Sequence, residues 1–337
     1  MNDKVLIHHG SGGLLMRNLI HDIFLRYFDN GILKSMTDSA ILVGKSGHFA
    51  FTTDSYVVDP LFFPGGNIGK LAVCGTVNDL AVSGAVPLYL SVSFIIEEGF
   101  SISDLEMIVR SMADEARMAG VKIVTGDTKV VQKGKADKLF VNTSGIGFIE
   151  KRYTGLSHGK GTKPGDLVMI NGTIGDHGIA ILNARESFNF SSGLSSDCTS
   201  LNKFIQTILR NTGEVRFMRD ATRGGLAAVL CEFAEKSGLG IEINENSIPV
   251  KEEVRGICEL LGFEPLHLAN EGKVVIIAGN QSGSKILDVM KKQKAGKNSS
   301  IIGRMVTDHP KKVKLITSSG GSRWIDLPSG EQLPRIC

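Results

Sequence analysis

The sequence predicts two domains of the α+β class followed by a tail. A chain of 337 residues is longer than a single hydrophobic core usually supports, so two domains are expected. Predicted strands and helices follow one another in both halves. A stretch rich in glycine, lysine and proline, Gly155 to Gly165, interrupts this pattern and is typical of a linker. We place the N-terminal domain at residues 1–153, the C-terminal domain at 154–309 and a flexible tail at 310–337.

The N-terminal half opens with a glycine-rich loop, His8-His9-Gly10-Ser11-Gly12-Gly13, before a predicted amphipathic helix from Leu14 to Phe28. Backbone N–H groups of such a loop can bind phosphate, although glycines near a chain end are also common without a ligand. Further on, a predicted strand leads directly into Gly126-Asp127-Thr128-Lys129. Hydrophobic patterning predicts strands over residues 36–43, 48–56, 87–96, 121–125 and 139–149, and helices over 67–83 and 103–119.

The C-terminal half repeats the style of the first. Its central motif, Arg219-Asp220-Ala221-Thr222-Arg223-Gly224-Gly225, leads into a helix that ends at Lys236. His177 is interpreted as a histidine at the start of a helix. The other predicted elements are strands over residues 167–171, 240–243, 273–278 and 300–306, and helices over 177–186, 201–209, 252–261 and 284–292.

Charge and cysteine content argue against several classes of function. The net charge is only +3 and no long basic run is present, so nucleic acid is not expected as the main partner. The five cysteines are odd in number and far apart, without zinc-type spacing, which suits a reducing compartment. The start of the chain lacks a secretion signal and no apolar run reaches roughly 18 residues. We therefore expect a cytoplasmic protein.

Common nucleotide and metal motifs are absent. The stretch from Gly65 to Leu71 resembles a P-loop only superficially, because the first glycine is misplaced and leucine stands where the metal-binding Ser or Thr belongs. No Gly-x-Gly-x-x-Gly and no His-Glu-x-x-His occurs. These observations disfavour a P-loop NTPase, a Rossmann enzyme and a zinc protease.

Aspartates at predicted strand ends and turns are the remaining candidates for chemistry. A single aspartate in a turn is usually structural. Several in similar settings, beside glycine or small residues, are more typical of a site for Mg²⁺, which binds carboxylates together with substrate phosphates. The candidates are Asp38, Asp54, Asp79, Asp127 and Asp220.

The chain also ends on a thiol. The glycine- and serine-rich run from Thr317 to Ser322 favours a loop, so Cys337 is expected on a mobile arm. The cation of Arg335 favours its thiolate, while the α-carboxylate opposes it. By itself the tail leaves both an inert and a reactive cysteine open, since free cysteines at chain ends are commonly inert.

Taken together, the motifs resemble the HypE family of hydrogenase maturation proteins, over essentially the whole chain. This family belongs with aminoimidazole ribonucleotide synthetase and selenophosphate synthetase, which share the PurM-like fold. Selenophosphate synthetases carry a reactive cysteine or selenocysteine in the N-terminal loop, whereas no cysteine of this chain precedes Cys74. The stretches that carry the resemblance are His9 to Gly13, Thr53 to Tyr56, Gly69-Lys70, Asn78 to Leu80, Gly126 to Lys129, Asp220 to Gly225, Ala269 to Gly272 and Pro334 to Cys337.

The resemblance implies a two-domain PurM-like α+β protein that binds ATP and Mg²⁺ and dimerises through its N-terminal domain. By position it implies metal binding by Asp38, Asp54, Asp79 and Asp220. It also implies nucleotide binding by Gly10, Ser11, Gly12, Gly13, Asp54, Asp79, Asp127 and Asp220.

The resemblance also implies a reaction on the chain's own terminus. The carbamoyltransferase HypF would load a carbamoyl group onto Cys337, and ATP would drive its dehydration to a thiocyanate for transfer to a HypC–HypD complex. Glu271 is our candidate base, and Lys129 its partner or a stabiliser of the developing oxyanion. The other four cysteines are interpreted as structural: Cys74, Cys198, Cys231 and Cys258.

Two alternatives stay open from the sequence. A selenophosphate or purine-type synthetase acting on a free small molecule would keep its activity without residues 329–337. A non-catalytic scaffold for other maturation proteins would show no Mg²⁺-dependent ATP hydrolysis. Either would use the same fold.

Overall fold

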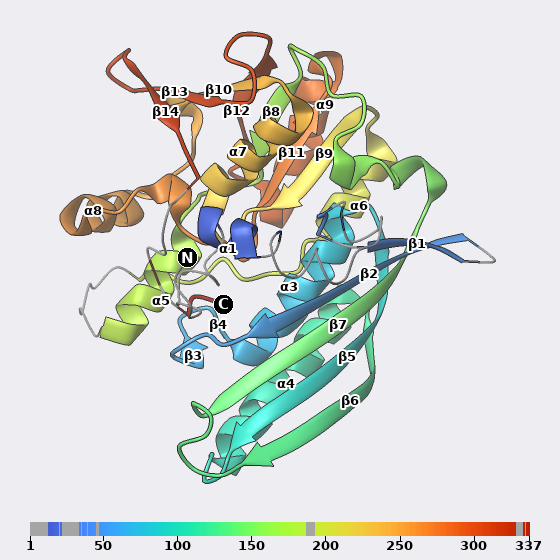
Figure 1. Cartoon of the computed structure of the whole chain (residues 1–337), viewed down its shortest axis with the longest axis vertical. Coiled ribbons are helices and arrows are strands. Elements are labelled where there is room, and N and C mark those ends of the chain that lie inside the picture. Colours follow the sequence, from blue (N-terminus) through green and yellow to red (C-terminus); the bar gives the residue numbers. More distant parts are fainter. Residues whose placement is uncertain are drawn as a thin grey trace.

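The structure, a computed structural model, describes residues 13–19, 21, 34, 36–38, 40–44, 47–186, 193–327, 333 and 335–337. One large β-sheet lies in each half of the chain, and the two halves pack against each other (Figure 1). The predicted two-domain α+β architecture is confirmed. The elements of the first half are α1 (Leu14–Leu19), β1 (Ala40–Gly44), β2 (Gly47–Tyr56), β3 (Phe62–Phe63), β4 (Gly66–Asn67), α3 (Ile68–Val82), β5 (Val86–Glu97), α4 (Ile102–Ala119), β6 (Lys122–Val131) and β7 (Leu139–Ile149).

The first sheet has five strands in the order β1-β2-β7-β5-β6. Only β5 and β6 run parallel. Helices α3 and α4 cover one face (Figure 1). Helix α3 starts after Asn67, whose side chain accepts from the backbone N–H of Lys70 at 3.0 Å. Every residue of α3 except Lys70 and Asp79 is buried, because the helix contacts the first sheet on one side and the second domain on the other. A helix that is apolar all round is typical of such a central position.

The opposite face of the first sheet is open in the single chain. Phe51, Ile146 and Tyr89 stand side by side on β2, β7 and β5, and 40%, 41% and 48% of their surfaces are exposed. Residues on these strands that point the other way, such as Leu90 and Val92, are buried against the helices. The sheet therefore presents an uncovered apolar face.

The second sheet has seven strands in the order β14-β13-β10-β12-β8-β11-β9. All residues of its strand β11 are buried, because helix α7 packs on one face and α6 and α9 on the other. The elements of the second half are β8 (Leu167–Ile170), α5 (Asp176–Glu186), α6 (Asn202–Asn211), β9 (Val215–Asp220), α7 (Gly225–Ser237), β10 (Gly240–Asn244), α8 (Glu252–Leu261), β11 (Val274–Ala278), α9 (Gly283–Lys291), β12 (Ser300–Val306), β13 (Val313–Ile316) and β14 (Ser322–Ile325).

Two predictions about local structure need correction. The tail does not begin at residue 310, because β13 and β14 form a hairpin that joins the second sheet beside β10. The buried side chains of Val313, Leu315 and Ile325 hold this hairpin in place. The strand predicted at 121–125 extends to Val131, so the motif Gly126 to Lys129 lies inside β6 and not in a loop after it.

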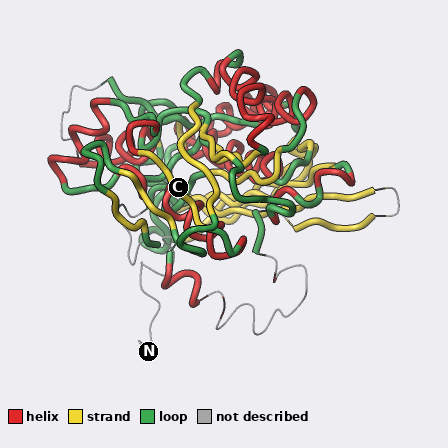
Figure 2. Tube along the Cα trace, turned by 90° about the horizontal axis from the view of Figure 1, so that it is seen from above, coloured by secondary structure: helices red, strands yellow, loops and turns green. Residues whose placement is uncertain are grey.

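The end of the chain lies inside the molecule, between the two domains. Both views place the C-terminus near the centre (Figures 1 and 2). The backbone N–H of Val57, just after β2, donates to the carbonyl oxygen of Cys337 at 3.0 Å. The last residues are thus part of the folded structure. Within the described ranges, no helix combines the length and apolarity needed to cross a membrane.

Candidate active site

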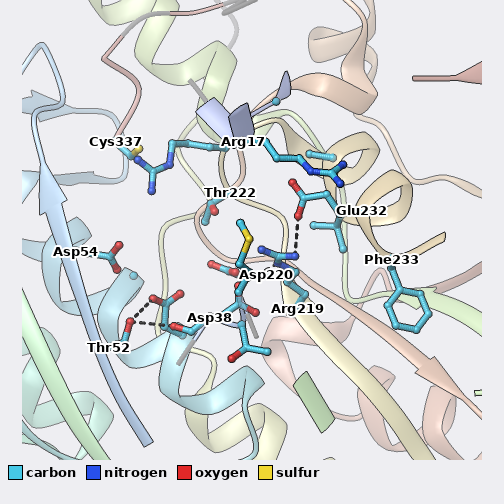
Figure 3. A pocket seen from close by; sticks show the side chains of 18 of the residues that line it. Arg17, Asp38, Thr52, Asp54, Arg219, Asp220, Thr222, Glu232, Phe233 and Cys337 are labelled. Carbon is cyan, nitrogen blue, oxygen red and sulfur yellow. Dashed lines mark hydrogen bonds and ion pairs between the residues drawn. The ribbon is translucent and has the colours of Figure 1, made fainter. Parts of the chain in front are cut away.

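A cavity of about 730 Å³ lies between the two domains. Its walls come from β2 and α3 on one side and from β9, α7 and the loop between them on the other (Figure 3). Cavities of this size commonly bind small molecules or cofactors. The residues predicted from the sequence that line it are Gly13, Asp38, Asp54, Asp79, Asp220, Glu271 and Cys337.

Four aspartates reach this cavity from separate elements. Asp54 lies on β2, Asp79 on α3 and Asp220 at the end of β9, while Asp38 precedes β1. The hydroxyl of Thr52 lies 2.8 Å from the Asp79 carboxylate and 3.0 Å from the Asp38 carbonyl oxygen. It therefore links two segments that are distant in the sequence. In Figure 3, Asp38 and Asp220 lie between Asp54 on one side and Arg219 on the other, and Thr52 lies below Asp54.

Negative charge in this cluster is only partly balanced. Burial raises the pKa of Asp220 to about 7, and the neighbouring Asp38 adds to the effect. Burial, with Asp54 and Asp220, also raises the pKa of Asp79 well above its usual range. Arg219 forms an ion pair with Asp38 at 3.0 Å. Groups that resist losing their protons in this way favour the arrival of a cation.

The donor set suits Mg²⁺. The ion binds oxygen ligands, and it usually takes one or two carboxylates together with water and substrate phosphates. Among the described residues, no group of three or more acidic, histidine or cysteine side chains is arranged as a ready metal cage. Asp54, Asp79 and Asp220 line the cavity and would hold the ion together with a phosphate-bearing ligand.

The loop after β9 depends on two adjacent glycines. Gly224 and Gly225 have φ angles of +74° and +61°, which favour glycine. A Cβ atom at Gly225 would lie 2.5 Å from the carbonyl oxygen of Leu268. This conformation turns the chain into α7 while Thr222 and Arg223 face the cavity.

Glu271 is a buried carboxylate whose atom Oε1 has no hydrogen-bond partner in the part of the chain described. It is 3% exposed, and burial raises its pKa well above the usual range. Its position is fixed through the backbone, because Asp197 accepts hydrogen bonds from the N–H groups of Glu271 and Gly272 at 3.0 and 3.2 Å. Lys273 forms an ion pair with Asp197 at 2.7 Å. When this carboxyl group is ionised, its raised pKa makes it a stronger base than an exposed glutamate, and Oε1 can accept a proton.

Cys337 lines the same cavity as Glu271 and the aspartates. Figure 3 shows it on the same side as Asp54. Negative charge at Cys337 is the largest cause of the raised pKa of Arg223. The cavity thus holds a thiol, a candidate base, a cation and an acidic cluster.

Asp127 and Lys129 are not brought to this cavity within one chain. They form an ion pair with each other at 2.9 Å on the exposed edge strand β6. Asp127 lies in register with Ser93, Asn142 and Ser55 across the sheet, and Ser55 lines the cavity. Three strand spacings of about 4.8 Å put Asp127 about 14 Å from Ser55. Of the predicted glycine-rich loop, Gly10, Ser11 and Gly12 lie outside the described residues.

Several functional side chains were not predicted. Arg219 and Arg223 flank Asp220 in the motif that leads into α7, so their charge beside a predicted acidic site was a usable signal. Thr52 and Tyr56 stand two residues before and after Asp54, on the same face of β2. Tyr56 donates to the Asp54 carboxylate at 3.2 Å. His177 has no such local signal, since its partners lie elsewhere in the sequence.

The raised pKa of Asp220 predicts how stability depends on pH. Folding moves that pKa from 3.8 to about 7, so between these values the folded chain binds more protons than the unfolded chain. The free energy of unfolding of the metal-free chain should therefore fall as pH rises through this window. Asp220→Asn should make this decrease in the free energy of unfolding smaller. Urea denaturation of the unmodified protein and of Asp220→Asn at several pH values measures the free energy of unfolding. An equal dependence on pH in the two proteins would show that Asp220 does not cause the decrease.

Two family models match the chain: the N-terminal domain of AIR synthase related proteins at residues 36–149, and the C-terminal domain at 163–316. The carbamoyl dehydratase HypE of Escherichia coli is 49% identical over 341 residues, which cover 99% of this chain and 100% of the relative. The corresponding protein of Rhizobium leguminosarum is 47% identical and covers 100% of this chain. The chain belongs to the HypE family of AIR synthase related carbamoyl dehydratases. The resemblance stated from the motifs is confirmed.

Solved HypE structures share the whole fold. A HypE chain from a HypE–HypF complex is 49% identical and matches with a TM-score of 0.86, covering 92% of this chain and 99% of that one. A HypE in complex with ATP is 44% identical, with a TM-score of 0.83, covering 99% and 100%. Thiamine monophosphate kinase from Aquifex aeolicus, 17% identical with a TM-score of 0.65, is similar in fold alone.

Proposed function

We propose that this protein uses ATP to dehydrate a carbamoyl group carried on Cys337, forming a protein-bound thiocyanate that supplies cyanide for hydrogenase maturation. The observation that carries the proposal is that Cys337 lines one cavity together with Glu271 and four aspartates. Family membership supports the same conclusion, since relatives of nearly equal length are carbamoyl dehydratases. A HypE structure in complex with ATP supports ATP as the second substrate.

The reaction needs a better leaving group than the amide oxygen of the thiocarbamate, S–C(=O)–NH₂. That oxygen attacks the γ-phosphorus of ATP, an O–P bond forms, and the bond to ADP breaks. Glu271 accepts one N–H proton as the carbon–nitrogen double bond forms. The departing phosphate takes the second N–H proton as the C–O bond breaks, and S–C≡N remains. The oxygen of the carbamoyl group thus ends in phosphate.

The chain's own residues orient and shield this reaction. Asp54, Asp79 and Asp220 would hold Mg²⁺, which when bound balances the charge of the ATP phosphates. Arg223 lines the cavity together with Cys337, so its guanidinium would counter negative charge at this end of the chain. The position between two domains limits access of water, which would otherwise hydrolyse the activated intermediate.

A second copy of the chain completes this proposal. The open apolar face of the first sheet carries Phe51, Tyr89 and Ile146, and the register puts Asp127 and Lys129 on that same face. We propose that the protein is a homodimer in which two such faces pack together. Asp127 and Lys129 of one copy would then meet the cavity of the other, as nucleotide and oxyanion contacts.

The dimer can be tested by charging this face. Ile146→Glu should produce monomers, because a carboxylate would be buried between two apolar sheets. The matched control is Ile102→Glu on α4, where the side chain is 77% exposed and away from the open face. Sedimentation measures the mass of each. A dimer that survives Ile146→Glu at micromolar concentration would contradict the proposed interface.

The proposed partners are the carbamoyltransferase HypF, as donor to Cys337, and a HypC–HypD complex, as acceptor of cyanide. The first is supported by a solved HypE–HypF complex of a 49% identical relative. The experiment that tests the function is mass analysis of the C-terminal peptide. Carbamoylated protein incubated with ATP and Mg²⁺ should lose the mass of one water molecule from the peptide that contains Cys337. Hydrolysis of ATP without this loss would contradict the proposal.

A further inference from the structure

The last residues of the chain occupy a site built for a peptide. They pair in antiparallel fashion with the segment after β2, since Val57 N–H donates to Cys337 O at 3.0 Å and Asp59 N–H to Arg335 O at 3.3 Å. Main-chain hydrogen bonds of this kind are a common mode of peptide recognition. The tail is therefore bound as a ligand would be.

Arginine side chains complete the pairing. Arg335 Nε donates to the carbonyl oxygen of Val57 at 2.8 Å. Arg185, on α5, donates to the carbonyl oxygens of both Asp59 and Arg335, at 2.7 and 2.9 Å. One guanidinium thus joins the tail to the segment on which it lies. All these bonds end on backbone carbonyl oxygens. The bonds from Arg185 therefore depend on the position of the tail's backbone and not on the identity of its side chains.

His177 holds the residue next to the thiol. Its Nε2 lies 2.7 Å from the carbonyl oxygen of Ile336, which can only accept, so Nε2 carries the proton. Its Nδ1 then accepts from the hydroxyl of Ser196 at 2.7 Å. Ser196 Oγ accepts in turn from the N–H of Cys198 at 3.1 Å. This chain of bonds fixes one tautomer of a completely buried imidazole and aims its N–H at the tail.

Apolar contacts add to the polar ones. Leu333 and Ile336 are only 8% and 6% exposed, and both belong to an apolar cluster that joins residues of both domains. A tail that merely rested on the surface would not bury both side chains. The site therefore holds the backbone from Arg335 to Cys337 and buries two apolar side chains near it.

We propose that residues 57–59, His177 and Arg185 form a binding site for the end of the chain, which we call the tail seat, and that His177 and Arg185 are positioning residues. The tail seat places the Cys337 sulfur in the cavity, and release of the tail breaks these contacts while both domains stay folded. The consequence for catalysis rests on the proposed function of Cys337, whereas the tail seat itself is inferred from the contacts of the tail alone.

The test measures how fast iodoacetamide alkylates each thiol of the full chain, without ATP or carbamoyl donor. In His177→Met the donor to Ile336 is lost at nearly the same side-chain length, so Cys337 should react about tenfold faster. His177→Gln is the matched control, because its amide N–H₂ keeps a donor near the position of Nε2. It should stay close to the unmodified protein.

Cys231 serves as the internal reference, because it lies on α7 and donates to the carbonyl oxygen of Ile325, outside the apolar cluster that contains the tail. Its alkylation rate should not change. Equal rates at Cys337 in all three proteins, or a parallel increase at all thiols in His177→Met, would overturn the tail seat. Arg185→Met provides an independent variant at a partly buried position and should also speed alkylation at Cys337 alone.

A second measurement separates positioning from folding. With carbamoylated chains, His177→Met should form thiocyanate more slowly at saturating ATP while the KM for ATP stays unchanged, and His177→Gln should restore most of the rate. A higher KM for ATP in both His177→Met and His177→Gln would indicate that the cavity itself is damaged, and it would overturn the positioning role. If alkylation changes as expected but no thiocyanate forms even in the unmodified protein, the proposed function fails and the tail seat stands.

Discussion

Cys337→Ala is expected to abolish thiocyanate formation while the fold and ATP binding remain intact. The sulfur is the atom to which the carbamoyl group would be attached, so its removal eliminates the substrate and leaves the cavity walls in place. Because the side chain is partly exposed at the end of the chain, stability should change by no more than about 0.5 kcal/mol. Mass analysis of the C-terminal peptide after incubation with HypF, a carbamoyl donor and ATP measures the effect.

Cys231→Ala is the matched control for this experiment. Cys231 is also a free, partly buried cysteine, but it lies on α7 and donates to the carbonyl oxygen of Ile325 at 3.3 Å. Its removal should leave thiocyanate formation unchanged. A carbamoyl group found on the terminal peptide of Cys337→Ala would rule out Cys337 as the carrier.

Glu271→Gln is expected to bind ATP and accept carbamoylation, yet to stall at the thiocarbamate. The carboxylate has an unpaired oxygen and a strongly raised pKa, and the amide that replaces it cannot accept the N–H proton. Loss of a positioned base commonly reduces rates by about 10²- to 10⁴-fold. The fold should persist, since Asp197 holds this segment through its backbone N–H groups. Single-turnover dehydration, followed by mass, provides the rate.

A carboxylate that is already paired provides the comparison. Glu235 also lines the cavity, but Arg17 binds it in an ion pair at 2.5 Å. Glu235→Gln should keep most of the dehydration rate. Full activity in Glu271→Gln would remove Glu271 as the base, and an equal loss in both variants would point to a general effect of charge in the cavity.

Patterns along the sequence predicted most elements, because burial in this fold follows local periodicity. The helix expected over 67–83 is Ile68–Val82, and the strand expected over 139–149 is β7. Strand β6 was predicted too short because nearly all its residues are exposed in the single chain, which removes the alternation that marks a strand. A strand with both faces exposed in the single chain is therefore difficult to predict from hydrophobic patterning.

The glycine- and serine-rich run before the tail was interpreted correctly as a turn and wrongly as the start of an arm. Thr317 N–H donates to the carbonyl oxygen of Gly321 at 3.0 Å, and this closes the hairpin between β13 and β14. A local signal identifies the turn, but only the parallel pairing of β13 with β10 decides that the hairpin belongs to a sheet. Long-range pairing of this sort is not encoded within the run itself.

In the site, too, residues with a local sequence signal were predicted and residues that depend on long-range contacts were not. Asp38, Asp54 and Asp220 were predicted because each stands beside a small residue, and Asp79 because it lies in the motif Asn78 to Leu80. All four line the cavity. His177 and Arg185 were not predicted as partners of the tail, since their contacts join residues about 150 positions apart in the sequence. Such contacts follow from how the domains pack.

The location of Cys337 in the cavity of its own chain sets the kinetic order of the proposed reaction. With ATP bound, dehydration becomes a unimolecular step of the dimer, so its rate does not depend on a Michaelis constant for the carbamoyl group. Tethering of this kind supplies a high effective molarity. Each loading of the thiol allows one turnover, so the output of the protein depends on how quickly its tail is charged and discharged elsewhere.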